Sequence, residues 1–442
     1  MSLLRITSAA ALCALFLALA LRQHSFVDAN AVNVLFWDQW DLYNPFFKGG
    51  GIWDIFSFQH GPHRQGISFL ITRVLAELSG WNVRWDAFAI SFCMMGGAVL
   101  GLRLATRCGM KFGIGLAAVP LFFLNLRQYE GFVGASNLSH GAMPMFLFML
   151  YCLTWFWENH AWRLVVLSLL SFILTFTGFG IFVAVLTPIL LGIELLHAVR
   201  SKQNDRARWV IAALVASALS WFLFSRGYRF DPAVDGFRFP YEKPIEYLYF
   251  MGLMFTNFFG IPGHGTLTIS IGVFITLSLA VICGGHGWQI LRAGIDGRRV
   301  SVVLFGLSAF ALLYTMNTAV GRVFLGFEDA PAASRYVPLM VPAGLALLLQ
   351  IGQIKNRKLN FGLGLFLALC TASGTVMLHE NDQKFVTWFR DGRQVWKETY
   401  LRTHNQAEAD RAANFKVFPV PVDARMTYLE KHKLNLFIPE KP

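Results

Sequence analysis

Residues 164–193 read LVVLSLLSFILTF-TGFG-IFVAVLTPILLGI, which is two apolar runs separated by the short segment TGFG at residues 177–180. The stretch contains no charged side chain, and a helix needs about 20 predominantly apolar residues to cross a bilayer. Four residues leave room only for a tight turn. The pattern therefore predicts two neighbouring transmembrane helices, centred near Leu169 and Val185.

The same pattern extends over most of the chain. Of the 442 residues, 55% are hydrophobic and only 14% are charged, whereas soluble domains carry about 25% charged residues. Windows of about 19 residues indicate about eleven spans. The first covers residues 6–21, and the others centre near Cys93, Val119, Leu147, Leu169, Val185, Leu214, Phe274, Phe310, Ala346 and Leu367. The sequence thus predicts an all-α polytopic membrane protein.

Basic residues alternate between connections and so predict the orientation. Short loops rich in Lys and Arg stay in the cytoplasm, which places the N-terminus there. The basic residues are Arg103, Arg107 and Lys111; Arg163; Arg200, Lys202, Arg206 and Arg208; Arg292, Arg298 and Arg299; and Lys355, Arg357 and Lys358. An odd number of spans then makes residues 1–378 the membrane module, with an external first loop at 23–84 and a small external region at 379–442.

The net charge of +12 does not indicate nucleic-acid binding, because the basic residues form short clusters between apolar stretches. The six cysteines show no metal-ligand spacing and are read as packing residues. Ala29-Asn30-Ala31 resembles a signal-peptidase site, so the first helix has two interpretations. We expect it to be retained, since the polar gap after Leu21 is long for a cleavage region.

The first external loop carries the candidate chemistry. Two carboxylates, Asp38 and Asp41, lie three residues apart between tryptophans, and this spacing places them on one face of a helix. Tryptophan favours the bilayer interface. Partial desolvation there raises the pKa of a carboxylate and improves it as a proton acceptor. The alternative interpretation is an interfacial turn with solvated acids.

His60, His63 and Arg64 follow in the same loop. No acidic or cysteine ligand lies nearby at metal spacing, so no metal is indicated, and contact with a phosphate or sugar suits these side chains better. Arginine recurs in loops predicted to be external, where the positive-inside rule disfavours it. A guanidinium fork suits an anionic lipid head, although contact with membrane lipid is the simpler explanation for any one of them. These arginines are Arg127, Arg226, Arg229, Arg238, Arg322 and Arg335.

Several motifs resemble the GT-C superfamily of polytopic glycosyltransferases, which use polyprenyl-phosphate sugars. Residues 37–41 (WDQWD) resemble the W-D-D-W-D motif of bacterial members, with Gln39 in place of the middle acid. Residues 60–64 (HGPHR) are similar to the H-N-E-H-R pattern that follows it, with Pro62 in place of Glu. Residues 127–130 and Ser334-Arg335-Tyr336 also match family features.

The resemblance implies a GT-C-like bundle in a bacterial inner membrane that takes part in cell-envelope glycan biosynthesis. It implies transfer of a sugar, such as arabinofuranose, from a polyprenyl-phosphate donor to a glycan, glycolipid or protein acceptor, with inversion and without a cofactor. Asp38 would act as general base and Asp41 would orient the acceptor, although these roles are interchangeable. His60, His63, Arg64, Arg127, Arg322, Arg335 and Tyr336 would bind the donor phosphate or sugar. The alternatives are an O-antigen polymerase or ligase, and a lipid-linked sugar flippase or transporter.

Overall fold

The computed structural model describes residues 3–230, 237–376 and 378–438 of the chain. In these ranges the protein is helical apart from turns and a two-stranded hairpin of β1 (Gln59–His60) and β2 (His63–Arg64). Seven helical stretches in the described residues are long and apolar enough to cross a membrane. Their helices are α1 (Leu3–Asn30), α6 (Arg84–Arg107), α11 (Ile181–Arg200), α12 (Asn204–Ser225), α14 (Thr266–Ala293), α15 (Arg299–Arg322) and α16 (Val337–Gly352).

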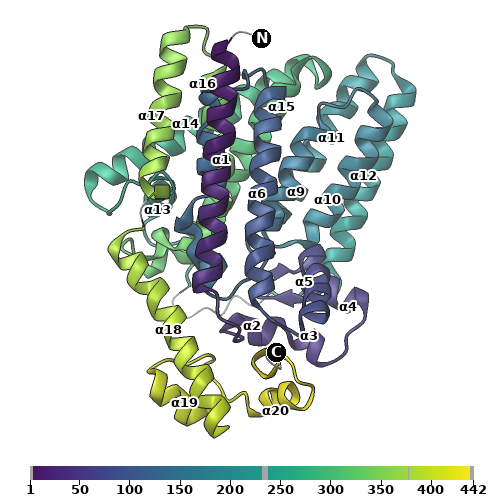
Figure 1. Cartoon of the computed structure of the whole chain (residues 1–442). Coiled ribbons are helices and arrows are strands. Elements are labelled where there is room, and N and C mark those ends of the chain that lie inside the picture. Colours follow the sequence, from purple (N-terminus) through teal and green to yellow (C-terminus); the bar gives the residue numbers. More distant parts are fainter. Residues whose placement is uncertain (1–2, 231–236, 377, 439–442) are drawn as a thin grey trace.

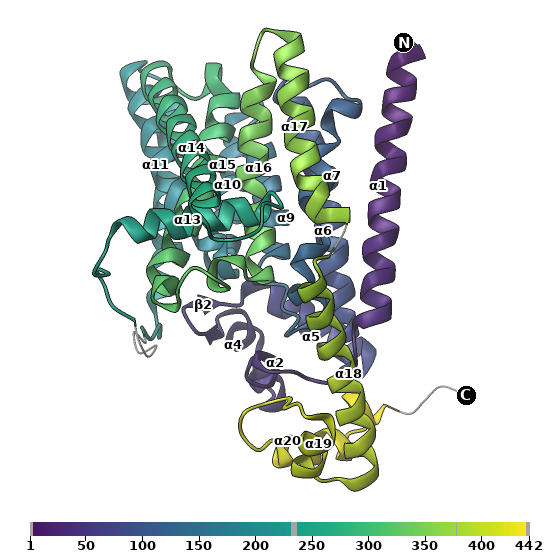
Figure 2. The ribbon, with the colours of Figure 1, turned by 90° about the vertical axis from the view of Figure 1, so that its left-hand side faces the viewer.

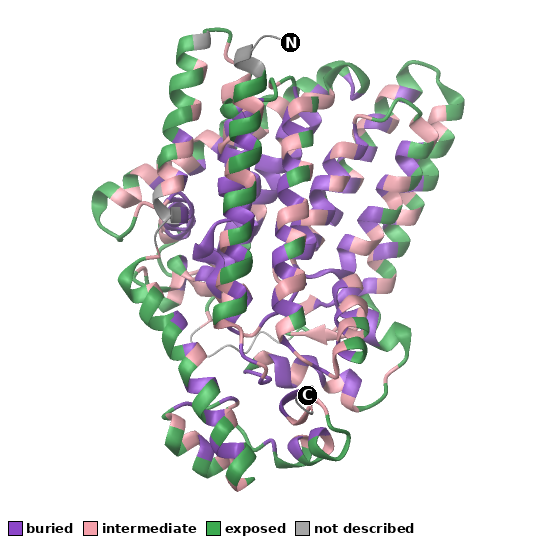
Figure 3. Cartoon of the chain, in the orientation of Figure 1, coloured by how far each residue is buried: buried purple, intermediate pink, exposed green. Residues whose placement is uncertain are grey.

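Three further apolar helices run beside them: α9 (Ala142–Thr154), α10 (His160–Phe176) and α17 (Arg357–Val376). Large apolar side chains such as Phe222 of α12 and Phe274 and Val281 of α14 are exposed, and stretches of the outer helices are coloured as exposed in Figure 3. Such surfaces are stable in lipid rather than in water. The architecture is that of an all-α multi-pass membrane protein, as the composition predicts.

One predicted span has a different form. The segment centred near Val119 forms η1 (Ile114–Leu116) and α7 (Ala118–Phe123), and α7 has only six residues. At about 1.5 Å per residue this helix is far too short to cross a bilayer. All of its residues are buried against neighbouring helices, and this burial explains why the segment is so apolar.

A helix that the hydropathy pattern did not predict, α13 (Ile245–Phe258), packs against α14. The two backbones meet at Gly252 and Gly272. A Cβ atom on Gly272 would lie 2.3 Å from the carbonyl carbon of Gly252. Small residues permit this close approach of helices in membranes.

The bundle has two different ends. The amino end of α1 lies at one end, whereas α2 (Asp38–Leu42), α3 (Asn44–Phe47), α4 (Ile52–Phe56) and α5 (Gly66–Ser79) gather at the other (Figure 1). We call the latter the loop end. Beyond it project the C-terminal helices α18 (Glu380–Thr403), α19 (Gln406–Ala413) and α20 (Asp423–Lys431), in both views (Figure 2).

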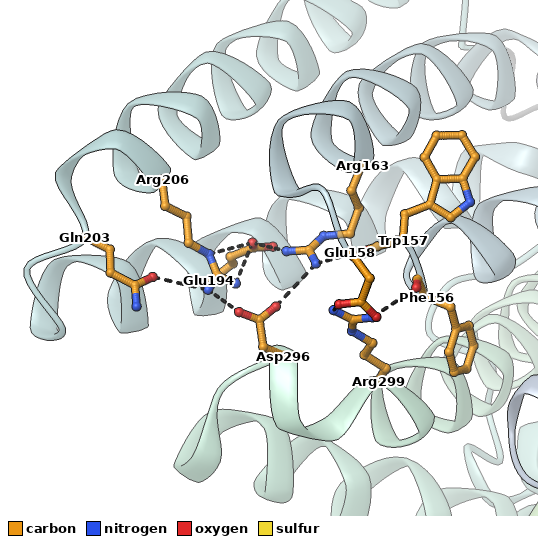
Figure 4. A network of polar contacts seen from close by, with 9 residues as sticks. All are labelled: Phe156, Trp157, Glu158, Arg163, Glu194, Gln203, Arg206, Asp296 and Arg299. Atoms are coloured by element: carbon orange, nitrogen blue, oxygen red, sulfur yellow. Dashed lines mark hydrogen bonds and ion pairs between the residues drawn. The ribbon is translucent and has the colours of Figure 1, made fainter.

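The opposite end, which we call the network end, is held by ion pairs (Figure 4). Glu194 of α11 accepts from Arg163 of α10 at 2.6 Å and from Arg206 of α12 at 2.8 Å. Asp296, which precedes α15, also pairs with both arginines. Arg299 pairs with Glu158 nearby at 2.8 Å. These contacts join three consecutive helices to the start of α15. Arg163 and Glu194, at their centre, are fully buried.

Candidate functional site

The predicted acidic motif lies where α1 gives way to the first loop. Trp37 precedes α2 with φ 46° and ψ −123°, a conformation that is strained for a bulky side chain. Gln39 is buried, accepts from the Phe36 amide at 3.1 Å and donates to the Ser136 carbonyl at 3.1 Å. A carboxylate could not donate this second bond. The amide therefore suits this position better than the acid of the W-D-D-W-D motif.

Asp38 opens onto a cavity of about 480 Å³ at the loop end. Its polar wall includes Asp38, Glu130, His140 and Arg335. Aromatic residues from the first loop and from α18 also line it: Phe36, Trp37, Phe385, Trp388 and Phe389. A largely apolar cavity with a few convergent polar groups is the usual form of a small-molecule site.

The carboxylate of Asp38 lies 3.7 Å from Nε2 of His60. Contact with His60 lowers the pKa of Asp38 from its usual value, and the nearby His140 and Arg335 act in the same direction. Burial raises the pKa, as we expected from the sequence, but its effect is smaller than the sum of the others. The net direction is thus opposite to our expectation, and Asp38 is ionised at neutral pH.

Arg335 is held by the wall of the cavity. Its Nη1 lies 3.9 Å from Oε1 of Glu130, and its backbone amide donates to Oε2 of the same residue at 2.8 Å. Ser334 donates to the Arg127 carbonyl and accepts from the Glu130 amide. These bonds fix η7 (Ser334–Tyr336) against α8 (Tyr129–Val133) and leave the Arg335 guanidinium half exposed.

Two further histidines lie near the Asp38–His60 pair: His140 is close to Asp38, and His63 is close to His60 and His140. Burial lowers the pKa of His140 to about 4 and that of His63 to about 3, so both rings are neutral at physiological pH. His63 packs on the ring of Phe179 at 4.1 Å. His140 was not among the residues predicted from the sequence, because a single histidine in a polar turn has no distinguishing pattern. Only the packing of that turn against α2 brings it to the cavity.

The other predicted residues lie elsewhere. Asp41 lies outside the cavity, and its carboxylate pairs with the Arg425 guanidinium of α20 at 3.6 Å. Arg64 donates to the backbone carbonyls of Ser57, Phe224 and Arg226. Arg127 donates to the carbonyl and side-chain oxygens of Asn257. Neither Arg322, at the end of α15, nor Tyr336, whose ring lies beneath the Arg335 guanidinium, is part of the cavity wall.

The described residues contain no group of three or more His, Cys, Asp or Glu side chains arranged to hold a metal ion. Comparison with known proteins finds no family model, no curated protein and no solved structure that matches this chain. The structure itself brings together five polar residues at the loop end: Asp38, His60, His140, Glu130 and Arg335.

Proposed function

We propose that the chain is a glycosyltransferase that moves a sugar from a polyprenyl-phosphate donor to an acceptor hydroxyl at the loop end of the bundle. The observation that carries this proposal is that an ionised carboxylate, Asp38, and a guanidinium, Arg335, line one cavity at the end of a membrane bundle. The positive-inside rule predicts that this end lies outside the cytoplasm. Nucleotide sugars do not cross the membrane, so a transferase there takes its sugar from a lipid carrier.

Asp38 acts as the general base. It takes the proton of the acceptor hydroxyl as that oxygen forms its bond to the anomeric carbon, and the bond from that carbon to the phosphate oxygen breaks. Arg335 stabilises the charge that grows on the leaving phosphate. Glu130 keeps the guanidinium in place through the contact at 3.9 Å. A single displacement of this kind inverts the anomeric centre.

The aromatic residues of the cavity suit a sugar. Trp37, Trp388 and Phe389 line the same cavity as the charged groups, and aromatic rings can bury the apolar face of a sugar. Relative to the sequence hypothesis, Arg64 and Arg127 lose their proposed contact with phosphate, because their donors bind backbone and side-chain oxygens of the protein itself. Of the predicted arginines, Arg335 is then the one that can stabilise the negative charge on the leaving phosphate.

The test is transfer by purified protein in lipid nanodiscs, with polyprenyl-phosphate sugars as donors and envelope glycolipid as acceptor. Asp38→Asn should lower transfer by about 100-fold or more, since a positioned base contributes that much. Asp54→Asn is the matched control, because Asp54 is exposed in the same loop, outside the cavity, and asparagine retains its bond to the Gly51 amide.

Full activity in Asp38→Asn would refute the assignment. Transfer only from diphosphate-linked oligosaccharides would indicate a polymerase or ligase instead. Movement of the intact lipid-linked sugar between leaflets, without transfer, would indicate a flippase.

A further inference from the structure

The C-terminal helices contact the Asp38 loop on several sides. The Trp37 amide donates to the Val417 carbonyl at 2.7 Å. The ring of Phe36 is stacked on Phe415 at 5.2 Å and meets Phe389 edge-on at 5.4 Å. These contacts hold the residue before Asp38 in its strained conformation, which persists only where surrounding structure fixes it.

Arg393 is at the centre of this arrangement. Its side chain is buried, and its guanidinium lies 5.6 Å from the centre of the Phe36 ring. It donates to the carbonyl of Val133, the last residue of α8, and to the carbonyl of Phe389 at 3.0 Å. Burial lowers the pKa of Arg393 to about 9, so the group stays charged at neutral pH. Charged donors make stronger hydrogen bonds than neutral ones.

The contacts of Arg393 reach two segments that contribute residues to the cavity. Phe36 and Trp37 lead into Asp38, whereas α8 carries Glu130, which holds Arg335. One buried guanidinium therefore links the segment that carries the base to the segment that holds the cation. A misplacement of about 1 Å between reacting groups can lower a rate by about 100-fold.

We infer that Arg393 is a positioning residue that sets the separation of Asp38 and Arg335, and that docking of α18–α20 completes the site. This inference rests on the proposed function. Arg393 does not line the cavity, so it contacts neither donor nor acceptor. Its loss therefore removes no reacting group, but it lets Asp38 move away from His60 and Arg335.

The experiment compares Arg393→Met with the wild-type full-length protein. Asp38 works as a base only when ionised, so activity falls as pH drops through its pKa. Loss of the His60 contact raises that pKa, and the acidic limb of the pH–rate profile should shift to higher pH. We expect kcat to fall by about tenfold or more with little change in KM, since positioning acts on the chemical step. Arg393→Lys should recover part of the loss.

Arg402→Met is the matched control, because Arg402 is exposed on the same helix. A purely structural role would reduce the amount of folded protein and leave the acidic limb in place. Hydrogen exchange adds a readout that needs no activity. Peptides covering residues 34–42 and 129–137 should exchange faster in Arg393→Met, whereas peptides of α10 and α11 should not change.

Wild-type exchange in both peptides, or an unmoved limb with unchanged kcat, would overturn the inference. Should Arg393→Met fail to fold, Arg393→Lys and Phe415→Leu carry the same readouts. If Asp38→Asn retains full transfer, the proposed function fails, and the exchange experiment still decides whether Arg393 links the segment before Asp38 to α8.

Discussion

The network end and the loop end contain the same kinds of charged side chain but arrange them differently. Glu194 at the network end accepts from two arginines at 2.6 and 2.8 Å. Asp38 at the loop end has one histidine at 3.7 Å, and Arg335 has one carboxylate oxygen at 3.9 Å. Charges at the first end are neutralised by one another, whereas those at the second remain open to a ligand. The comparison suggests that the first set maintains the bundle and the second acts on a substrate.

Glu194→Gln should give the largest effect. It leaves the buried Arg163 without its closest counter-charge, and breaking a buried pair in this way costs about 3–5 kcal/mol. We expect a large drop in the thermal unfolding midpoint in detergent, with transfer per folded molecule near the wild-type value. A large fall in transfer with normal stability would contradict the division between the two ends.

Arg335→Gln should give the reverse result. Removal of a group that stabilises developing charge lowers kcat by about 100-fold, which corresponds to about 2.7 kcal/mol of transition-state stabilisation. The unfolding midpoint should stay close to wild type, because the side chain is half exposed. Arg402→Gln, at an exposed position of α18, serves as the control. Unfolding comparable to that of Glu194→Gln would show that Arg335 is structural.

His60→Gln tests whether His60 controls the ionisation of Asp38. Contact with His60 is the main factor that lowers the pKa of Asp38, so its removal raises this pKa. Because the ionised form is the active base, the acidic limb of the pH–rate profile should move to higher pH, while the rate on the plateau changes less. His432→Gln, in the exposed C-terminal region, should leave the limb unchanged. An unmoved limb in His60→Gln would exclude this electrostatic role.

Glu158→Gln should have the smallest effect. Its carboxylate pairs with Arg299 at 2.8 Å but is almost fully exposed, and solvent screens such pairs. We expect neither the unfolding midpoint nor the transfer rate to change measurably. A shift as large as that of Glu194→Gln would mean that burial does not distinguish the two carboxylates.

The sequence predicted the helical membrane architecture well, because long apolar stretches are a direct consequence of the bilayer as solvent. It could not separate lipid-facing helices from buried ones, since both are apolar. This ambiguity explains why the segment near Val119 was predicted as a span although α7 has six residues. The buried α13 was missed for another reason: its 14 residues are shorter than the window of about 19 residues that detects a span.

The candidate site was predicted only in part. The motif around Asp38 could be selected from the sequence because it has two carboxylates three residues apart between tryptophans. Arg335 could be selected because arginine is disfavoured in loops predicted to be external. The partners of Arg64 and Asp41 could not be predicted from the sequence. Arg64 binds the Phe224 carbonyl and Asp41 pairs with Arg425, and both partners are distant in sequence. Whether an arginine binds a ligand or the protein's own backbone is decided by tertiary contacts.

The ion-pair network also constrains the order in which the chain is assembled. Arg163 and Arg206 bond to Asp296, which follows them by 133 and 90 residues respectively. During synthesis, α10, α11 and α12 therefore enter the membrane before this carboxylate exists. Until α14 has been inserted, Glu194 is the only one of these two carboxylates that can pair with Arg163 and Arg206. The network is complete only after the second half of the bundle has been made.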